Sequence, residues 1–284
     1  MYCRHIWLLI ILVISAVILL FQPRRISFME SGDERVINLM KMFEDSSVSE
    51  STKLDSGDRG SRDEGVYTFC YNKGTPEKTL KKFVGPDWTF ISWPSAGIDS
   101  FEETTKQIVN EGNKEPLIDK VGWYGNIHSP LNDVPEHRTR PLLKELGEQH
   151  ADMCDIVHID GHRIRTHEEY MSLPDLVKNY KYLLDIGGNG FSARLHYLLF
   201  SNRPLLLVDR DYVQYFYEDL EPFVHYVPVK RDLSDFIDQV QWVRNNPEKC
   251  KEIACNAQEY ALENFTYEKI LDRIREVNKN INSS

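Results

Sequence analysis

The sequence predicts an α/β protein with a parallel sheet, and two observations in residues 168–284 support this prediction. Short apolar runs typical of buried strands occur at residues 182–186, 204–208 and 224–229. Helical stretches such as residues 232–245 separate them, with apolar residues at the three- and four-residue spacing of one helix face. Strands that alternate with helices form βαβ units, which build parallel sheets.

Local signals set the helices of this half. Ser172 is expected to cap a helix whose first turn contains Pro174. A glycine-rich turn after the first strand is expected to lead into a helix over residues 191–200. Two more helices are predicted, one starting at Pro247 and one over residues 267–277.

Residues 66–167 are less regular, and we expect them to form a second, smaller α/β unit. The predicted helices of this part cover residues 100–110 and 141–150. The predicted strands cover residues 66–71, 88–93, 121–125 and 155–159.

Composition and charge restrict the class of protein. Apolar residues make up 41% and aromatic residues 11% of the 284 residues, which is ordinary for a globular chain. Acidic residues number 44 against 34 basic ones, giving a net charge of -10. This balance argues against a nucleic-acid partner, which would require a basic face. The acidic balance does not exclude a site that holds one small phosphate ligand with two or three arginines.

The N-terminus predicts a membrane anchor. Residues 6–21 form a nearly unbroken apolar run, followed by Pro23, Arg24 and Arg25. The run just reaches the length that a bilayer needs. No small-residue cleavage site follows it, so we expect an uncleaved anchor over residues 1–25, with a secretory signal peptide as the alternative.

A flexible stem is predicted over residues 26–65, because residues 44–65 contain only two sizeable apolar side chains. Two further units follow, one over residues 66–167 and one over residues 168–284. An anchor, a stem and a globular part are typical of single-pass membrane enzymes facing the lumen of the endoplasmic reticulum or Golgi. The sequon at Asn264 predicts a glycosylation site in that compartment.

The glycine turn of residues 184–194 predicts a pyrophosphate site. Its glycines would let the backbone approach a ligand, and Ser192 and Arg194 would lie in the first turn of the following helix. A dinucleotide site and an S-adenosylmethionine methyltransferase site share these features, with Asp209 as the ribose ligand. A tight turn without any ligand is also possible. The late position of the turn favours the second domain of a two-domain glycosyltransferase.

Further residues give the chain a likeness to a known family. They are Trp123, Tyr124, Gly125 and Asn126, then Arg138 and Arg140, then residues 180–184, 191–194, 222–229 and 232–233. On these residues the chain resembles glycosyltransferase family 90 from about residue 120 to residue 270. This is the capsule-associated and lipopolysaccharide-modifying group that includes the Rumi protein O-glucosyltransferases.

The resemblance implies a GT-B architecture with two facing Rossmann-like domains and the donor between them. It implies that residues 66–167 form an N-terminal Rossmann-like, acceptor-side domain and residues 168–284 the nucleotide-sugar-binding domain. It further implies an inverting transfer from a nucleotide sugar, with a UDP-sugar as the expected donor, to a hydroxyl of a protein or glycan, without a metal or a cofactor. The implied donor-binding residues are Asn189, Gly190, Phe191, Ser192, Ala193, Arg194 and one of Arg138 and Arg140. Two arginines from opposite domains would then neutralise the leaving diphosphate. Further candidates for the donor pocket are Trp123, Gly125, Asn126, Asp209, Tyr226 and Asp232.

The catalytic base is the point at which the sequence departs from the family. Members place an Asp just before a Pro after a strand of the first domain, whereas no Asp precedes Pro94 here. Asp99 is the first candidate base and Asp87 the second, and a turn or capping role is the alternative for each. Two other functions therefore stay open: a methyltransferase, and a relative that binds a nucleotide sugar without catalysis.

Overall fold

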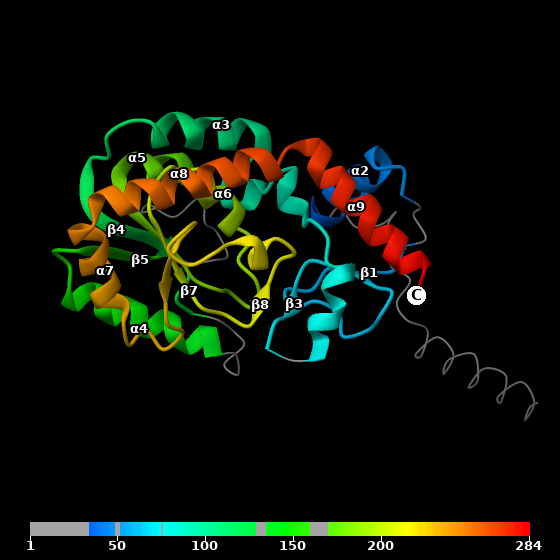
Figure 1. Cartoon of the computed structure of the whole chain (residues 1–284), viewed down its shortest axis with the longest axis horizontal. Coiled ribbons are helices and arrows are strands. Elements are labelled where there is room, and N and C mark those ends of the chain that lie inside the picture. The colour runs from blue at the N-terminus through cyan, green and yellow to red at the C-terminus, as the bar shows by residue number, and fades with distance from the viewer. Residues whose placement is uncertain (1–33, 49–51, 75, 129–134, 160–169) are drawn as a thin grey trace, which may run out of the picture.

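A parallel sheet of five strands forms the centre of the protein (Figure 1). The structure is a computed structural model, which describes residues 34–48, 52–74, 76–128, 135–159 and 170–284. The strands of the sheet are β4 (Ile118–Gly125), β5 (Cys154–His158), β6 (Tyr180–Asp185), β7 (Leu205–Val208) and β9 (Val227–Val229). Their spatial order is β5-β4-β6-β7-β9, and every neighbouring pair is parallel.

This strand order places a topological switch point between β4 and β6. From β4 the chain goes outward to β5, and it then returns across β4 to build β6, β7 and β9 on the other side. In open parallel sheets, ligands bind outside the carboxyl ends of the strands at such a switch point. The fold therefore directs attention to the residues that follow β4 and β6.

Helices cover both faces of the sheet, and α3, α5 and α8 lie together on one side (Figure 1). The helices of this layer are α3 (Phe101–Gly112), α5 (Leu173–Asn179), α6 (Leu195–Leu199) and α8 (Pro247–Asn264). The other layer contains α4 (Pro135–Gln149) and α7 (Phe236–Asn245). Successive residues of a strand point to opposite faces of the sheet. Leu183 therefore packs in the hydrophobic core on the side of α3 and α5, and Leu184 packs in the core on the side of α4 and α7.

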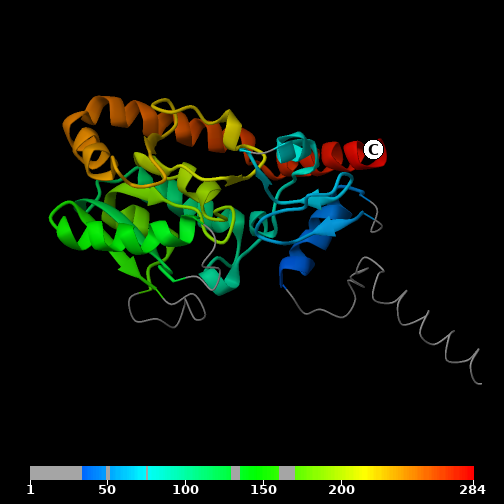
Figure 2. The ribbon, with the colours of Figure 1, turned by 90° about the horizontal axis from the view of Figure 1, so that it is seen from below.

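The remaining elements form a smaller unit beside the sheet. The C-terminal helix α9 (Tyr267–Asn282) packs against this unit (Figure 2). This unit starts with α2 (Glu34–Asp45), which contacts α9. Its short strands are β1 (Leu54–Asp55), β2 (Tyr67–Thr68) and β3 (Tyr71–Asn72), and its 3-10 helices are η1 (Pro76–Phe83), η2 (Trp88–Phe90) and η3 (Pro94–Ala96). The strand β8 (Tyr212–Val213), followed by η5 (Tyr217–Asp219), pairs with β3 and so links this unit to the sheet unit.

Most predicted elements of residues 168–284 are confirmed. Ser172 caps α5 by accepting a hydrogen bond from the backbone N–H of Asp175 at 3.2 Å. The predicted strands at residues 182–186, 204–208 and 224–229 correspond to β6, β7 and β9. The predicted helix over residues 191–200 shrinks to the five residues of α6, because the chain continues through bends and turns up to Arg194.

The predicted boundary between two domains at residue 167 falls between strands of one sheet. A boundary at residue 167 would separate β4 and β5 from β6, yet β4 pairs with β6 through Val121 and Tyr182 and through Gly122 and Leu183. One Rossmann-like sheet therefore includes strands from both predicted domains. The second facing sheet of a GT-B arrangement is not seen in the described residues, where residues 34–115 contribute only two-residue strands.

Two local predictions also need correction. Part of the predicted flexible stem is α2, which buries Val36, Leu39 and Met42 against the core because they share one helix face. The predicted strand over residues 88–93 is the 3-10 turn η2, which Asp87 caps.

The predicted anchor over residues 1–25 lies outside the described residues. Within the described ranges, no helix has the length and apolar character needed to cross a membrane.

Candidate active site

Two arginine side chains join the carboxyl ends of β4 and β6 at the switch point. Arg194, which follows the glycine turn after β6, donates from Nη1 to the Tyr124 carbonyl at 2.7 Å. Arg140 of α4 donates from Nη1 to the Asn126 carbonyl and from Nε to the Gly187 carbonyl, both at 2.8 Å. The structure thus brings together two predicted donor-binding arginines.

Both arginines belong to the sheet unit, whereas the resemblance implied that they come from opposite domains. Arg138 also lies in α4, but its side chain is outside the described set. Both guanidinium groups lie over the buried ring of Trp123, Arg194 at 5.5 Å and Arg140 at 5.7 Å from the ring centroid. Gly125 gives this ring its space, because a Cβ there would approach the Trp123 ring to 2.7 Å.

The buried carboxylate of Asp185 organises the end of β6. Ser192 donates to its Oδ1 at 2.8 Å, and Arg194 Nε approaches the same oxygen at 3.4 Å. Arg210, which follows β7, forms an ion pair with Oδ2 at 2.9 Å. Asp185 and Arg210 are 0% and 1% exposed. One carboxylate therefore faces two guanidinium groups, which leaves a positive charge at low dielectric.

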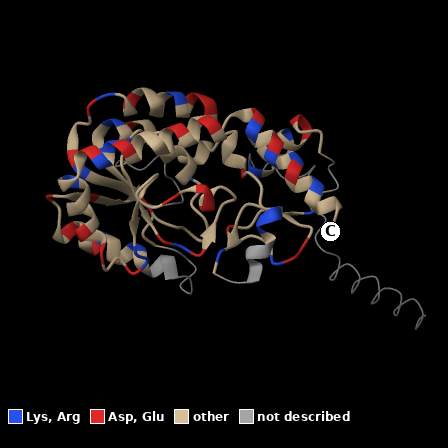
Figure 3. Cartoon of the chain, viewed as in Figure 1, with Lys and Arg blue, Asp and Glu red and all other residues tan. Residues whose placement is uncertain are grey.

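An anion would relieve this local excess of positive charge. Burial also lowers the pKa of Arg194, because it penalises the charged form. The excess is a property of this edge, since the chain carries a net charge of -10 and its described helices display acidic and basic residues side by side (Figure 3).

Residues 57–60, here called the 57–60 segment, cross over the glycine turn. The Asp58 carbonyl accepts hydrogen bonds from the Phe191 backbone N–H at 3.3 Å and from the Cys70 thiol at 3.2 Å. Arg59 Nε donates to the Asn189 carbonyl at 3.3 Å. A Cβ at Gly190 would lie 1.6 Å from the Asp58 carbonyl oxygen. The close approach that Gly190 permits is therefore made by the protein's own backbone.

Charged side chains continue along the edge past β7. Lys73, which follows β3, pairs with Asp209, and its Nζ also lies over the Tyr217 ring at 5.1 Å. Arg231, which follows β9, lies 2.6 Å from Asp211 Oδ1 and 3.6 Å from Asp209 Oδ2. Through Lys73, the N-terminal unit therefore contacts the carboxyl edge of the sheet, where Arg194 also lies.

The other predicted donor residues have different surroundings. Phe191 packs in the core against Phe69 and Trp88, and Ala193 packs on the same core. Tyr226 is buried, and burial raises its pKa. Asp232 is exposed and accepts a hydrogen bond from the Ser234 backbone N–H at 3.0 Å, so its visible role is a local turn.

The two candidate bases differ in accessibility. Asp87 is 1% exposed; its Oδ1 accepts from the backbone N–H and hydroxyl of Thr89, and its Oδ2 accepts from Gln214 at 2.9 Å. This geometry fits the capping role better than a base open to an acceptor hydroxyl. Asp99 is exposed and lies just before α3, whose Phe101 packs on Tyr197 of α6. Asp99 as the base stays a prediction.

The sequence identifies a family at this point. A model described as glycosyl transferase family 90 matches residues 34–278. The chain belongs to glycosyltransferase family 90. The resemblance seen in the sequence is therefore confirmed at the level of the family.

Protein O-glucosyltransferases of two vertebrates match parts of the chain. Protein O-glucosyltransferase 1 of Bos taurus is 33% identical over 212 residues, which is 68% of this chain and 52% of the relative. Protein O-glucosyltransferase 2 of Danio rerio is 37% identical over 93 residues, 33% of this chain and 18% of the relative. The chain thus matches about half or less of the length of these relatives.

A solved structure of Anabaena HepE in complex with UDP and glucose is also similar. It has a TM-score of 0.41 and 14% identity, and the match covers 68% of this chain and 55% of that one.

Sequence reasoning missed several residues of this family 90 site. They are Asp185 and Arg210 in the interior and Arg59, Lys73 and Arg231 nearer the surface. A signal for two of them was present, because Asp185 is the last residue of one buried strand and the Asp-Arg-Asp run at residues 209–211 follows the next. The carboxyl ends of neighbouring parallel strands meet at one edge, which brings such residues together.

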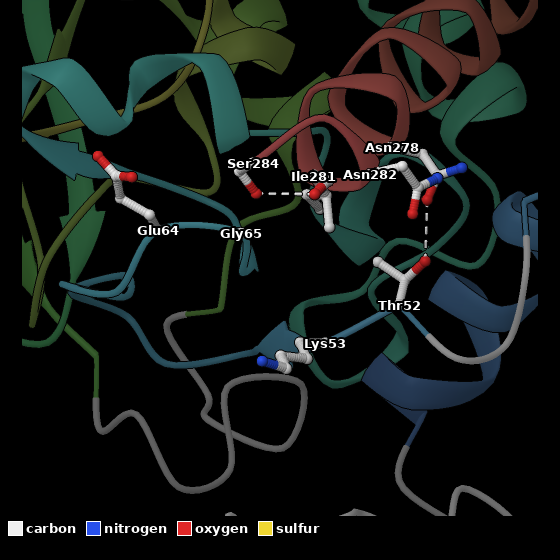
Figure 4. A pocket seen from close by; sticks show the side chains of 8 residues that line it. All are labelled: Thr52, Lys53, Glu64, Gly65, Asn278, Ile281, Asn282 and Ser284. Atoms are coloured by element: carbon white, nitrogen blue, oxygen red, sulfur yellow. Dashed lines mark hydrogen bonds between the residues drawn. The ribbon is translucent and has the colours of Figure 1, made fainter.

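A polar cavity of about 430 Å³ lies away from this edge, between residues 52–53 and 64–65 and the end of α9 (Figure 4). Thr52 Oγ1 donates to Asn278 Oδ1 at 3.0 Å across it. None of the predicted site residues lines this cavity. Within the described ranges, no group of three or more His, Cys, Asp or Glu side chains is placed to hold a metal.

Proposed function

We propose that the chain transfers a sugar from a UDP-sugar to a hydroxyl of a protein or glycan, with inversion and without a metal or cofactor. The observation that carries this proposal is the arginine pair at the switch point beside the buried positive cluster of Asp185, Arg194 and Arg210. The names of the relatives in Bos taurus and Danio rerio make glucose and a protein acceptor the first candidates.

The arginines supply what the departing nucleotide diphosphate needs. Arg194 uses Nε and Nη1 for Asp185 and Tyr124, and its Nη2 makes no hydrogen bond with the described residues. A diphosphate at the switch point would accept from this Nη2, while Arg140, whose guanidinium also lies over the Trp123 ring, adds a second positive charge. Fixed positive groups aimed at developing negative charge lower the barrier, as a metal does in other transferases.

The N-terminal unit is proposed to form the acceptor side of the site, in place of the second facing domain of GT-B enzymes. Its 57–60 segment covers the glycine turn, and its Lys73 reaches Asp209 beyond β7. The acceptor would thus meet the donor between these residues and the carboxyl edge of the sheet.

An acceptor hydroxyl needs a base to take its proton, and Asp99 is the proposed group. Its carboxylate is exposed, in contrast to that of Asp87. The closed position of Asp87 favours a second candidate function, a nucleotide-sugar-binding relative without catalysis. Family membership disfavours the methyltransferase alternative.

Sugar transfer is tested by UDP release from UDP-glucose with a panel of folded protein acceptors. We expect turnover by the natural chain, and a loss of about 10²–10⁴-fold in Asp99→Asn at unchanged UDP affinity. Asp238→Asn, a change at another exposed aspartate in the first turn of α7, is the control and should keep full activity. UDP binding without turnover of any nucleotide sugar would establish the non-catalytic alternative instead.

The location is proposed to be the lumen of the endoplasmic reticulum or Golgi, with residues 1–25 as a single-pass anchor. The apolar run at residues 6–21 and the sequon at Asn264 support it. In the fold, Asn264 Nδ2 donates to the Tyr260 carbonyl at 2.9 Å. In sealed microsomes, protease should leave the globular part intact, and its digestion from outside would refute the lumenal location.

A further inference from the structure

Arg210 is a buried charge with open hydrogen-bonding capacity. It is 1% exposed, its Nε donates to the Val208 carbonyl at 3.3 Å, and its Nη1 lies 2.9 Å from Asp185 Oδ2. Neither Nη1 nor Nη2 has a hydrogen bond of good geometry with the described residues. Buried donors are normally satisfied, so the position of Arg210 needs an explanation beyond packing.

Asp185 is shared unequally between its two arginines. Arg210 approaches Oδ2 at 2.9 Å, whereas Arg194 reaches Oδ1 only at 3.4 Å and shares that oxygen with Ser192. Arg210 therefore supplies the closer countercharge. Because one arginine suffices to neutralise one carboxylate, the charge of Arg194 is left without full compensation.

We propose that Arg210 is a positioning residue for the donor: by neutralising Asp185, it keeps the guanidinium of Arg194 available to the diphosphate. The inference rests on the proposed function, since it assigns to Arg194 a diphosphate ligand. Without Arg210, the Asp185 carboxylate would be balanced by Arg194 alone. The diphosphate would then compete with a buried carboxylate for the same guanidinium, and charge attraction at low dielectric makes that competition strong.

A cycle of variants separates this role from simple structural support. In Arg210→Met, we expect UDP to bind about tenfold more weakly or worse, as for the loss of a charge-assisted interaction. In Asp185→Asn/Arg210→Met, the competing carboxylate is gone and Asn can still accept from Ser192. UDP affinity should then return to within about threefold of the natural chain. Arg210→Lys keeps the positive charge, so it should lose less UDP affinity than Arg210→Met.

The measurement is calorimetric titration of the full chain with UDP and, separately, with inorganic pyrophosphate, after thermal unfolding has shown that each variant is folded. Equal UDP affinity of Arg210→Met and the natural chain would overturn the inference. So would a double variant that binds no better than Arg210→Met, because a purely structural role predicts additive damage.

The two probes keep the inference separate from the proposed function. If the natural chain binds pyrophosphate but not UDP, and the variants follow the expected order with pyrophosphate, the inference holds and the UDP-sugar proposal fails. If the natural chain binds UDP and Arg210→Met binds it equally well, only the inference fails. If the natural chain binds neither probe, both are refuted.

Discussion

The carboxylate of Asp87 connects the N-terminal unit to the sheet unit, because Thr89 and Gln214 both donate to it. Burial raises the pKa of Asp87 from 3.8 to about 6. Between these two values the unfolded chain has released a proton that the folded chain still holds. The contribution of Asp87 to stability is thus complete below about pH 4 and falls as the pH rises toward about 6.

Asp87→Asn should remove this pH dependence, since the amide stays neutral and can still accept from Thr89. The free energy of unfolding of the variant relative to the natural chain should rise by about 3 kcal/mol from pH 4 to pH 7, because one pKa unit corresponds to about 1.4 kcal/mol. Urea unfolding at several pH values measures it.

Asp232→Asn is the control, because the pKa of Asp232 is shifted in the opposite direction from that of Asp87. Hydrogen bonds from Ser234 lower the pKa of Asp232, so its stabilisation is present above its unfolded pKa and disappears as the pH falls. A difference between Asp87→Asn and the natural chain that stays constant from pH 4 to pH 7 would show that the buried carboxylate does not titrate there.

The glycine turn and the 57–60 segment are held together by hydrogen bonds, although about 130 residues separate them in sequence. Asp58 accepts from Phe191, and Arg59 donates to Asn189. The segment lies in a stretch whose composition predicts a flexible stem, and its order comes from these contacts with the turn. The contacts also place Arg59 beside the proposed donor.

Gly190→Ala and Gly188→Ala form a matched pair within this turn. A Cβ at Gly190 would lie 1.6 Å from the Asp58 carbonyl oxygen, whereas a Cβ at Gly188 would meet Arg140 Nη2 at an acceptable 3.4 Å. We expect Gly190→Ala to lose about 1–3 kcal/mol of stability and to expose residues 53–65 to protease, as overpacking does. Gly188→Ala should stay close to the natural chain. Similar losses in both variants would refute the covering role of the 57–60 segment.

Local patterns predicted the elements better than their assembly. The apolar runs that become β6 and β7 and the cap at Ser172 are visible in sequence because burial and capping act over a few residues. The pairing of β4 with β6 joins residues about 60 positions apart, and no local signal carries that information. The helix α2 could have been predicted, since Val36, Leu39 and Phe43 repeat at helical spacing.

The candidate site was predictable to a similar extent. The glycine turn, Arg140 and Arg194 were found, because strand-to-turn patterns and the family resemblance are local in sequence. The pairing of Asp185 with Arg210 depends on the register of β6 against β7, in which Asp185 lies beside Leu207. The covering of Gly190 by Asp58 depends on tertiary packing alone.

Across the protein, one parallel sheet and one smaller unit meet at an edge where positive charge is concentrated in an otherwise acidic chain. Arg140 and Arg194 lie at the switch point, Arg210 behind it, and Lys73 and Arg231 further along the edge. We propose that these arginines hold the nucleotide diphosphate of the donor, so that this edge is the donor site.

The most direct test is the thermal stabilisation of the full chain by UDP, compared with S-adenosylmethionine and NAD, in the natural chain, Arg194→Ala and Arg244→Ala. Arg244 is an exposed arginine in the last turn of α7 and is not one of the candidate site residues, so it is a control for charge. At a hundred times its dissociation constant, UDP should add about 2.7 kcal/mol, or about 5–10 °C, to the natural chain and to Arg244→Ala. Arg194→Ala should lose most of this shift. Equal stabilisation of Arg194→Ala, or stabilisation by S-adenosylmethionine or NAD in place of UDP, would contradict the account.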